Sequence, residues 1–351
     1  MQPTDLADWA RPAGRPDPLP ELDAVERLVE AFGHTVDVQV IGRAVARGRS
    51  WPIHGLSIGA RGRVPTLCLV GGVHGVERVG THVVLAFLAT LAELARWDPM
   101  MQAHLRRVRV CAVPLVNPVG MSLHRRGNGR GVDLMRNAPV GDDALATPWV
   151  GGQRVSPLLP WYMGPADGPM EPEACALLQF VRDQVFSADP ALLLDLHSGF
   201  GSVDRLWFPW ARTRRPFPHV AEVHGLRRLL DRTLPNHVYR VEPIARVYTV
   251  RGDLWDHAYD EHRAAHPERL FLPLTLEMGS WAWVRKNPRQ LLSLLGGFNP
   301  MREHRLRRVM RRHLPLLDFL LRAVAAPSAW APRDDRQRRT WSADAFATYF
   351  A

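Results

Sequence analysis

The sequence predicts a single α/β domain with a mixed, mostly parallel twisted sheet and helices on both faces. Apolar runs of strand length alternate with amphipathic runs of helix length along most of the 351 residues, and this alternation is typical of α/β domains. No internal repeat and no convincing linker divides the chain. The expected division is an irregular, proline-rich N-terminal arm over residues 1–20, one domain over 21–326 and a polar tail over 327–351.

The N-terminal half is expected to supply the first strands of this sheet. Its segments are a helix at 21–32, strands at 35–41, 51–58 and 64–70, an amphipathic helix at 81–94 and a buried strand at 108–115. Gly33 is expected to end the first helix. The stretch from Asn117 to Gly168 is loop-like and rich in Gly, Pro and Arg. A loop of this length in a compact domain is usually functional.

The C-terminal half continues the alternation. Its segments are a helix at 171–186, a strand at 191–196, a helix at 220–234, a short strand at 237–241, a helix at 253–264, a strand at 270–276 and a long amphipathic helix at 301–324. Pro315 is expected to kink or break the last helix, because proline lacks the N–H that a helix interior uses. The tail, which carries Trp330 and Trp341, is expected either to be mobile or to pack on the surface.

The composition argues against several classes of protein. Cys68, Cys111 and Cys175 lie in apolar contexts without a CxxC pair, which argues against a disulfide framework and against a thiolate zinc site. No run reaches the ~18 apolar residues of a membrane helix. The first residues lack the basic and apolar regions of a secretory signal. The expected location is therefore the cytoplasm, with no membrane partner.

The formal net charge is +10, and Lys286 is the only lysine. The densest basic run extends from Arg302 to Arg312, where arginines interleave with apolar residues at helical spacing. The solvated face of a packed helix explains this run better than a nucleic-acid site, because no nucleic-acid motif accompanies it. No nucleic-acid partner is expected, and the oligomeric state is left open.

Polar residues follow or end three of the expected buried strands: His74 with Glu77, His197, and Glu277. In α/β proteins, ligands bind at such strand ends. Two histidines and one carboxylate would leave a fourth zinc position open for water, and a further carboxylate could act on that water as general base. The reaction class implied is hydrolysis of an amide bond.

Each of these residues also has a structural explanation. Glu77 alone could favour a helix N-terminus, and His197 alone could be a hydrogen-bonded core histidine. Glu277 is harder to explain in this way, because burying a carboxylate without a partner is costly.

Taken together and in order, these residues resemble the zinc carboxypeptidase family, the funnelin-type metallocarboxypeptidases. His74-Gly75-Val76-Glu77 resembles the HxxE zinc ligands, and His197 resembles the third ligand. The whole resemblance extends from about residue 64 to residue 279. Its other motifs are Arg126-Gly127-Asn128 with the GVDLMRN segment at 131–137, Glu171-Pro172-Glu173, Tyr248 with Gly252, Asp256 and Tyr259, and Glu277 within TLEMG at 275–279.

The resemblance implies a role for each matched residue. One zinc ion would be held by His74, Glu77 and His197, with Glu277 as general base. Asp133 would orient His74, as metal-bound histidines usually require. The other implied roles are oxyanion stabilisation by Arg126, capture of the substrate carboxylate by Arg136, closure over substrate by Tyr248, and substrate binding by Asn128.

Two positions depart from the family pattern. The asparagine that precedes the carboxylate-binding arginine is Met135 here, and methionine cannot donate a hydrogen bond to a carboxylate. The residue at the floor of the specificity pocket is Trp255, whose indole would shorten that pocket and disfavour long charged side chains.

The resemblance therefore implies a zinc-dependent carboxypeptidase or related amidase, acting on a small peptide or cell-wall peptide fragment with a free carboxylate. One alternative is a zinc-dependent deacylase of N-acyl amino acids, similar to aspartoacylase and succinylglutamate desuccinylase. The other is a non-catalytic zinc- or carboxylate-binding relative, which only Met135 favours.

Overall fold

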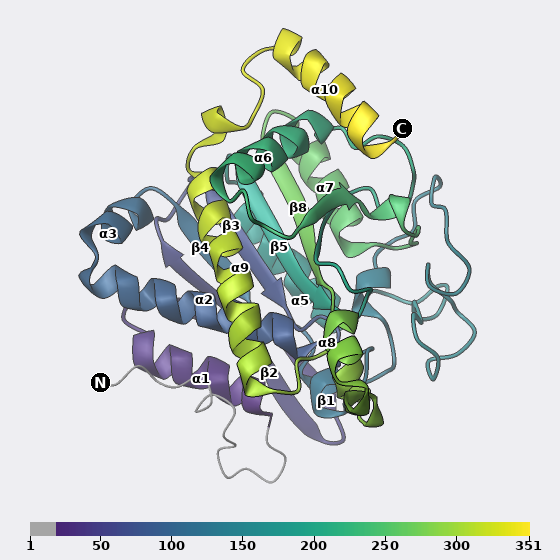
Figure 1. Ribbon diagram of the computed structural model, residues 1–351. Coiled ribbons are helices and arrows are strands. Elements are labelled where there is room, and N and C mark those ends of the chain that lie inside the picture. Colours follow the sequence, from purple (N-terminus) through teal and green to yellow (C-terminus); the bar gives the residue numbers. More distant parts are fainter. Residues whose placement is uncertain (1–18) are drawn as a thin grey trace.

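An eight-stranded mixed sheet in the order β1-β2-β4-β3-β5-β8-β6-β7 forms the centre of the protein (Figure 1). The computed structural model describes residues 19–351, so the predicted N-terminal arm lies almost wholly outside the described residues. The strands are β1 (Asp37–Ala46), β2 (Arg49–Gly59), β3 (Thr66–Gly71), β4 (Arg109–Val113), β5 (Ala191–Ser198), β6 (Arg205–Phe208), β7 (Arg240–Pro243) and β8 (Phe271–Met278).

The four central strands β4, β3, β5 and β8 are parallel, whereas β2 pairs with β1 and β4, and β6 pairs with β8, in antiparallel fashion. Every residue of β3 and β5 is buried, because helices cover both faces of the parallel centre. This burial explains their continuous apolar sequence. The predicted α/β fold with a mixed, mostly parallel sheet is confirmed.

Helices pack on both faces of the sheet. They are α1 (Pro20–Phe32), α2 (Arg78–Trp97), α3 (Pro99–Leu105), α4 (Pro118–Ser122), α5 (Pro172–Val185), α6 (Val220–Thr233), α7 (Leu254–Ala265), α8 (Trp281–Lys286), α9 (Glu303–Val324) and α10 (Asp335–Tyr349). The α2 and α9 helices cover one face of the central strands, and α5 and α7 cover the other (Figure 1).

Three features differ from the expectations or complete them. The α9 helix continues through Pro315, so the expected break is wrong. The tail forms α10, which packs against α6, and Trp330 is fully buried with its indole N–H donating to the Ala323 carbonyl at 2.8 Å. The short elements β6, α3, α4 and α8 were not expected, because segments of four to seven residues carry little periodic signal. The division of the chain into arm, domain and tail stays a prediction.

Within residues 19–351, one helix is long and apolar enough by length and composition to cross a membrane. This helix is α2, which packs against β3, β5 and α9. Most of its side chains are buried inside the protein, as in the core helix of an α/β domain.

The topology brings the predicted site residues to one edge of the sheet. The parallel strands β3, β5 and β8 are neighbours, so their carboxyl ends lie together. His197 of β5 is directly opposite Glu277 of β8 in the strand register. His74 and Glu77 lie between the end of β3 and the start of α2.

Candidate active site

His74, Glu77 and His197 converge at the carboxyl edge of the sheet. Their candidate ligand atoms all lie within 4.8 Å of one another, and all three side chains are buried. This is the only such group of metal-capable side chains among the described residues. The metal ligands predicted from the sequence therefore lie together in the structure, although His197 follows Glu77 by 120 positions.

Two close backbone approaches place the loop that carries His74 and Glu77. A Cβ atom at Gly75 would lie 2.1 Å from the backbone of Gly120, and one at Gly80 would lie 2.3 Å from the Leu196 carbonyl oxygen. Only glycine fits such approaches. Gly75 thus lets the loop pack against the start of α4, and Gly80 lets the first turn of α2 pack against β5.

His197 lies between two carboxylates. Its Nδ1 is 3.0 Å from Glu77 Oε2, and its Nε2 is 2.6 Å from Asp195 Oδ2. Burial alone would lower the pKa of His197, but the charges of Asp195 and Glu77 and their hydrogen bonds raise it well above its ordinary value. The two carboxylates therefore make the surroundings of the His197 ring favourable for a positive charge.

His74 contacts a different pair of groups. Its Nε2 is 2.7 Å from Arg126 Nη2, and its Nδ1 is 3.7 Å from Asp133 Oδ1, beyond hydrogen-bond distance. The Nδ1 atom is buried without a hydrogen-bond partner among the described residues. Burial, reinforced by the Arg126 charge, lowers the pKa of His74 to about 3. His74 is therefore neutral at pH 7, the form that binds metals.

The carboxylate of Glu77 is held by three hydrogen bonds. Its Oε2 accepts hydrogen bonds from Ser198 N at 3.0 Å and from His197, and its Oε1 accepts one from Arg126 Nη1 at 3.1 Å. Burial alone would raise the pKa of Glu77, but the two histidines and Arg126 lower it to about 2. The carboxylate is thus ionised and fixed in place.

Glu277 is the second carboxylate of the site. Its Oε1 accepts a hydrogen bond from Phe200 N at 2.9 Å. Burial and the nearby charge of Glu77 raise the pKa of Glu277 to about 8. A carboxylate with a pKa near the working pH is suited to take up and release a proton.

Two arginines share Asp133 next to these ligands. Arg126 Nε and Arg136 Nη1 each donate to Asp133 Oδ2 at 2.9 Å, and Arg136 Nε donates to the Val150 carbonyl at 2.9 Å. Burial alone would raise the pKa of Asp133, but the two guanidinium groups hold it well below its ordinary value. The Met135 N–H also donates to Asp133, at 3.1 Å. Asp133 therefore fixes both arginines at the site.

Tyr248 packs into an aromatic cluster beside these groups. Its ring lies 5.9 Å from that of Phe200 and 5.8 Å from that of Trp207, measured between ring centroids. Burial raises its pKa, and the charges of Arg136, Glu277 and Arg126 also act on its hydroxyl. The predicted closing tyrosine thus lies on the same side of the sheet as the predicted base and the arginines.

Comparison with known families decides what kind of site this is. A family model described as zinc carboxypeptidase matches residues 22–282, most of the chain. The chain belongs to the zinc carboxypeptidase family. The resemblance predicted from the sequence motifs is therefore confirmed.

Individual relatives are more distant. Carboxypeptidase SOL1 of Arabidopsis thaliana is 30% identical over 124 residues, which are 33% of this chain and 25% of that protein. The chain thus matches only about a quarter of the length of this curated relative.

Solved structures establish the shared fold. Bovine thrombin-activatable fibrinolysis inhibitor, in complex with tick carboxypeptidase inhibitor, is similar with a TM-score of 0.63 and 17% identity over 90% of this chain and 98% of that one. Carboxypeptidase A of Helicoverpa armigera is similar with a TM-score of 0.58 and 19% identity over 88% of this chain and 72% of that one.

The donor set in this carboxypeptidase-family chain fits a zinc ion. Two histidines and one carboxylate form the type of catalytic site that leaves one position open. Two further observations also support a zinc site. The Nδ1 of His74 has no hydrogen-bond partner among the described residues, and two carboxylates flank His197. Both His197 Nδ1 and Arg126 Nη1 contact the Glu77 carboxylate, at 3.0 and 3.1 Å.

Asn128 is held by contacts within the protein that the sequence analysis did not predict. Its amide nitrogen donates to Glu171 Oε2 at 2.8 Å and to Glu173 Oε2 at 3.1 Å, and its Oδ1 accepts from the N–H groups of Arg130 and Val132. Both ends of the buried amide are thus occupied. Asn128 therefore fastens the 126–133 loop to the start of α5, and its contact with a substrate stays a prediction.

Trp255 makes a contact that the sequence analysis did not predict. It is 3% exposed, and its indole N–H donates to Asp195 Oδ2 at 2.8 Å. Asp195 Oδ2 therefore accepts from both Trp255 and His197. Trp255 thus supports the carboxylate behind a candidate zinc ligand, and its place on the floor of a specificity pocket stays a prediction.

The sequence analysis missed the role of Asp195. Asp195 is fully buried, and its Oδ1 has no hydrogen-bond partner among the described residues. The available signal was an acidic residue inside an apolar strand, two positions before His197, because such a buried charge requires a partner.

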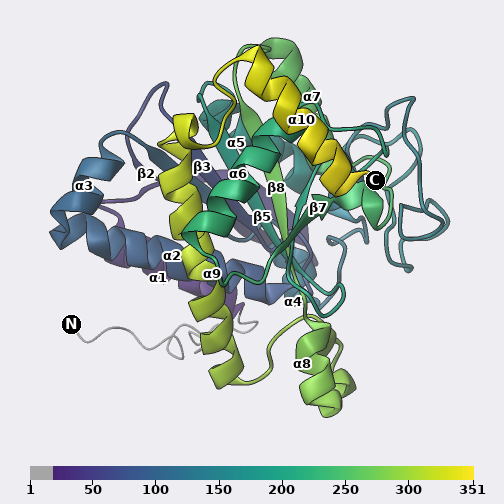
Figure 2. The same ribbon diagram turned by 45° about the horizontal axis from the view of Figure 1, so that its top comes forward.

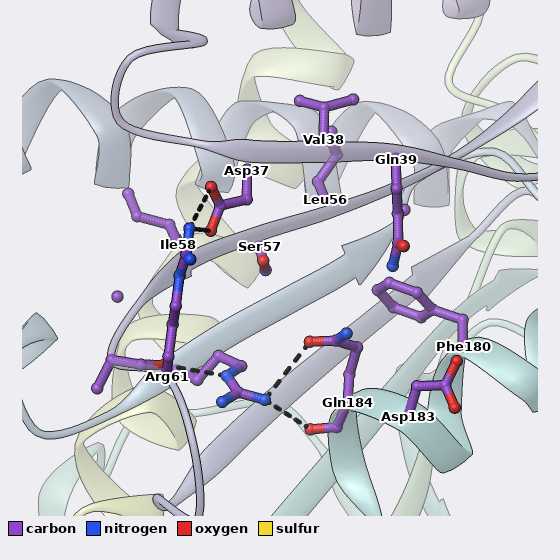
Figure 3. Close-up of a pocket in the computed structure, with 14 residues that line it drawn as sticks. Asp37, Val38, Gln39, Leu56, Ser57, Ile58, Arg61, Phe180, Asp183 and Gln184 are labelled. Carbon is purple, nitrogen blue, oxygen red and sulfur yellow. Dashed lines mark hydrogen bonds and ion pairs between the residues drawn. The ribbon is translucent and has the colours of Figure 1, made fainter.

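A cavity of about 380 Å³ lies away from this site, between β1, β2 and the end of α5 (Figure 3). Asp37 and Arg61 form an ion pair at 2.8 Å on one side. On the other side, Arg109 donates to the carbonyl groups of Ala60, Gly62 and Gln184. None of the candidate catalytic residues lines the cavity.

Proposed function

We propose that this member of the zinc carboxypeptidase family removes C-terminal residues from peptides by zinc-dependent hydrolysis. The observation that carries the proposal is the convergence of His74, Glu77 and His197 within 4.8 Å, beside the buried carboxylate of Glu277. Three protein ligands with one open position are the arrangement of a catalytic rather than a structural zinc site.

Each side chain has a defined part in this proposal. Zinc held by His74, Glu77 and His197 would polarise a carbonyl and lower the pKa of a water molecule. Glu277 accepts the proton of the attacking water and passes it to the departing amine. Arg126 donates to the carbonyl oxygen as negative charge develops there.

The terminal carboxylate of the substrate is proposed to bind Arg136. Asp133 and the Val150 carbonyl fix its Nη1 and Nε. Its Nη2 forms no hydrogen bond within residues 19–351 and is left to donate to a substrate. Met135 removes the second donor that the family pattern would supply, so carboxylate binding here rests mainly on the charge of Arg136.

The proposed substrate is a small peptide or a cell-wall peptide fragment with a small terminal residue. The bulk of Trp255 near the expected specificity pocket, held by Asp195, disfavours a long terminal side chain. We further propose that the protein acts in the cytoplasm, which fractionation of cells producing it would test.

The decisive experiment is an activity screen with the zinc-loaded chain on peptides that differ only in the C-terminal residue, with products identified by mass spectrometry. Release of the terminal residue is expected, fastest for small residues. Glu277→Gln should retain zinc and lose ~10²–10⁴-fold in kcat, the usual contribution of a positioned base. Wild-type rates in this variant would refute the role of Glu277.

N-acyl amino acids belong in the same screen. Faster hydrolysis of these compounds than of any peptide would instead assign the chain as a deacylase. Stoichiometric zinc without turnover of either class would identify a non-catalytic relative.

A further inference from the structure

The segment that follows β8 exposes an unusual set of apolar side chains. Leu291, Leu292 and Leu294, which we call the leucine tip, are 49%, 93% and 64% exposed. Trp281 and Met301, at the two ends of the same segment, are each 46% exposed. Single exposed leucines are normal. Several on one short segment indicate an interaction surface.

The two ends of this segment are fastened to the rest of the protein, through Trp281 to the Gly199 carbonyl and through Asn299 to Val76 and Val79. The segment from α8 to the start of α9 projects beyond the sheet on the side where α9 begins (Figure 2). It is also internally braced, because Ser280 Oγ donates to the Gly297 carbonyl and Gln290 Nε2 donates to the Gly296 carbonyl, each at 2.6 Å. Arg305 Nη1 of α9 donates to the Trp283 carbonyl at 2.9 Å. The leucine tip is therefore presented outward by a fixed framework.

The sequence that carries the leucine tip is basic up to Glu303, the first residue of α9, which pairs with Arg307. Residues 279–302 contain four basic side chains and no Asp or Glu: Arg285, Lys286, Arg289 and Arg302. A cavity of about 150 Å³ between α8 and α9 is lined by Lys286, His304, Arg305 and Arg308, among others, and by no acidic residue. Lys286 and Arg308 have no ion pair within the part of the chain that the structure describes.

We propose that this segment docks the protein on an anionic phospholipid membrane. The leucine tip enters the boundary between headgroups and acyl chains, and the surrounding basic side chains bind lipid phosphates. Apolar side chains flanked by Lys and Arg are the features by which peripheral proteins bind anionic bilayers. The chain would lie on the membrane and not span it, which departs from our expectation of no membrane partner.

A protein partner fits these observations less well. The leucines lie on a projection and not in a groove. A second copy that presented the same surface would bring four positive side chains against four others, and like charges repel. A bilayer with negative headgroups satisfies both the apolar and the basic side chains at once.

The location of this surface has a consequence for access to the site. Trp281 lies four positions after Glu277, and its indole N–H donates to the Gly199 carbonyl at 3.1 Å. Phe200, whose N–H contacts Glu277, is 36% exposed. Docking would therefore place the Glu277 side of the molecule close to the membrane, where peptides attached to lipid would be in reach. This last point rests on the proposed function, whereas docking itself does not.

The test is flotation of the purified full chain with vesicles of phosphatidylcholine, with and without phosphatidylserine, at low and high salt. Binding is expected only with phosphatidylserine and should weaken with salt. The double variant Leu292→Ser/Leu294→Ser should lose at least tenfold in affinity. Lys286→Gln/Arg289→Gln should also lose at least tenfold, because each basic residue near an anionic surface contributes roughly fivefold.

Matched controls use exposed residues elsewhere. Leu158→Ser changes a leucine that is 86% exposed, and Arg336→Gln/Arg339→Gln removes two charges from α10. Both should bind vesicles like the wild type. Thermal unfolding checks that all variants are folded, and peptide hydrolysis by the double leucine variant in vesicle-free solution should be unchanged.

Four results would overturn the proposal. They are no binding to phosphatidylserine vesicles, equal losses in test and control variants, complete displacement by inorganic phosphate at matched ionic strength, and a dimer of the wild type that the leucine variant converts to a monomer. The third would assign the cavity as a free-anion site, and the fourth would make a second copy the occupant.

Discussion

The candidate active site has two halves that are built differently. His197, Asp195 and Glu277 lie on the neighbouring strands β5 and β8, with Trp255 of α7 behind them. We call these four residues the strand half. His74, Asp133 and Arg126 lie on loops that follow β3 and α4, and we call them the loop half.

The two histidines show what this difference means. The carboxylate behind His197 is at 2.6 Å from its ring nitrogen and receives a second hydrogen bond from Trp255. The carboxylate next to His74 is at 3.7 Å and is engaged by two arginines instead. The ring of His197 is therefore already oriented for a metal, which would replace only its contact with Glu77, another candidate ligand. In the loop half, the contacts of Arg126 with His74 and Glu77 must be exchanged when a metal binds.

The largest expected effect concerns the buried acid of the strand half. The pKa of Glu277 is raised to about 8 from an ordinary 4.5, so the folded protein binds this proton more tightly than the unfolded chain does. The resulting stabilisation is fully present below pH 4.5 and is lost as the pH rises through 8. Metal-free Glu277→Gln should therefore match the wild type near pH 4.5 and become more stable than it by up to ~4 kcal/mol near pH 9.

Urea unfolding in the presence of a chelator at several pH values measures this difference. Zinc should reduce it, because a nearby cation favours the ionised carboxylate. A difference that is constant with pH would mean that Glu277 ionises normally in the folded chain.

The support behind His197 gives the next largest effect. Asp195→Asn keeps the size of the side chain but removes the charge that orients the ring, and such partners usually contribute ~10–100-fold to metal affinity. Chelator competition measures the zinc Kd. The counterpart in the loop half, Asp133→Asn, should change the Kd less and the free energy of unfolding more, because Asp133 mainly holds two buried arginines. The reverse order would contradict the proposed difference between the halves.

The sequence predicted the candidate ligands and base of the site better than it predicted the residues that support them. His74, Glu77, His197 and Glu277 were predictable because strand ends and family motifs both point to them. Trp255 and Asn128 matched motif positions, yet their partners, Asp195 and the Glu171–Glu173 pair, were not recognised from sequence. A motif gives the position of a side chain along the chain. The direction in which it points depends on residues that are distant in sequence.

Trp255 allows a smaller and more specific test. Trp255→Phe retains most of the volume and removes one donor from the buried carboxylate of Asp195. We expect the zinc Kd to rise roughly fivefold, the equivalent of one hydrogen bond. The visible spectrum of the Co²⁺-substituted protein should also shift if the orientation of His197 changes. An unchanged Kd and spectrum, with altered preference for the terminal residue of the substrate, would show that Trp255 acts only through the pocket and not through His197.

Substitution of Arg126 is expected to change the zinc Kd least, and it is the only substitution expected to lower that Kd. Its guanidinium contacts His74 Nε2 at 2.7 Å and Glu77 Oε1 at 3.1 Å, two of the groups that would hold zinc. Binding of the ion must displace these contacts, so Arg126→Gln should tighten zinc binding by a few-fold. The same variant should lose roughly 10²–10³-fold in kcat, because a donor to the developing oxyanion is missing. Chelator competition and peptide turnover on one preparation measure both quantities. If zinc binding weakens instead, Arg126 supports the ligands and does not compete for them, and the loop half would then be as prearranged as the strand half.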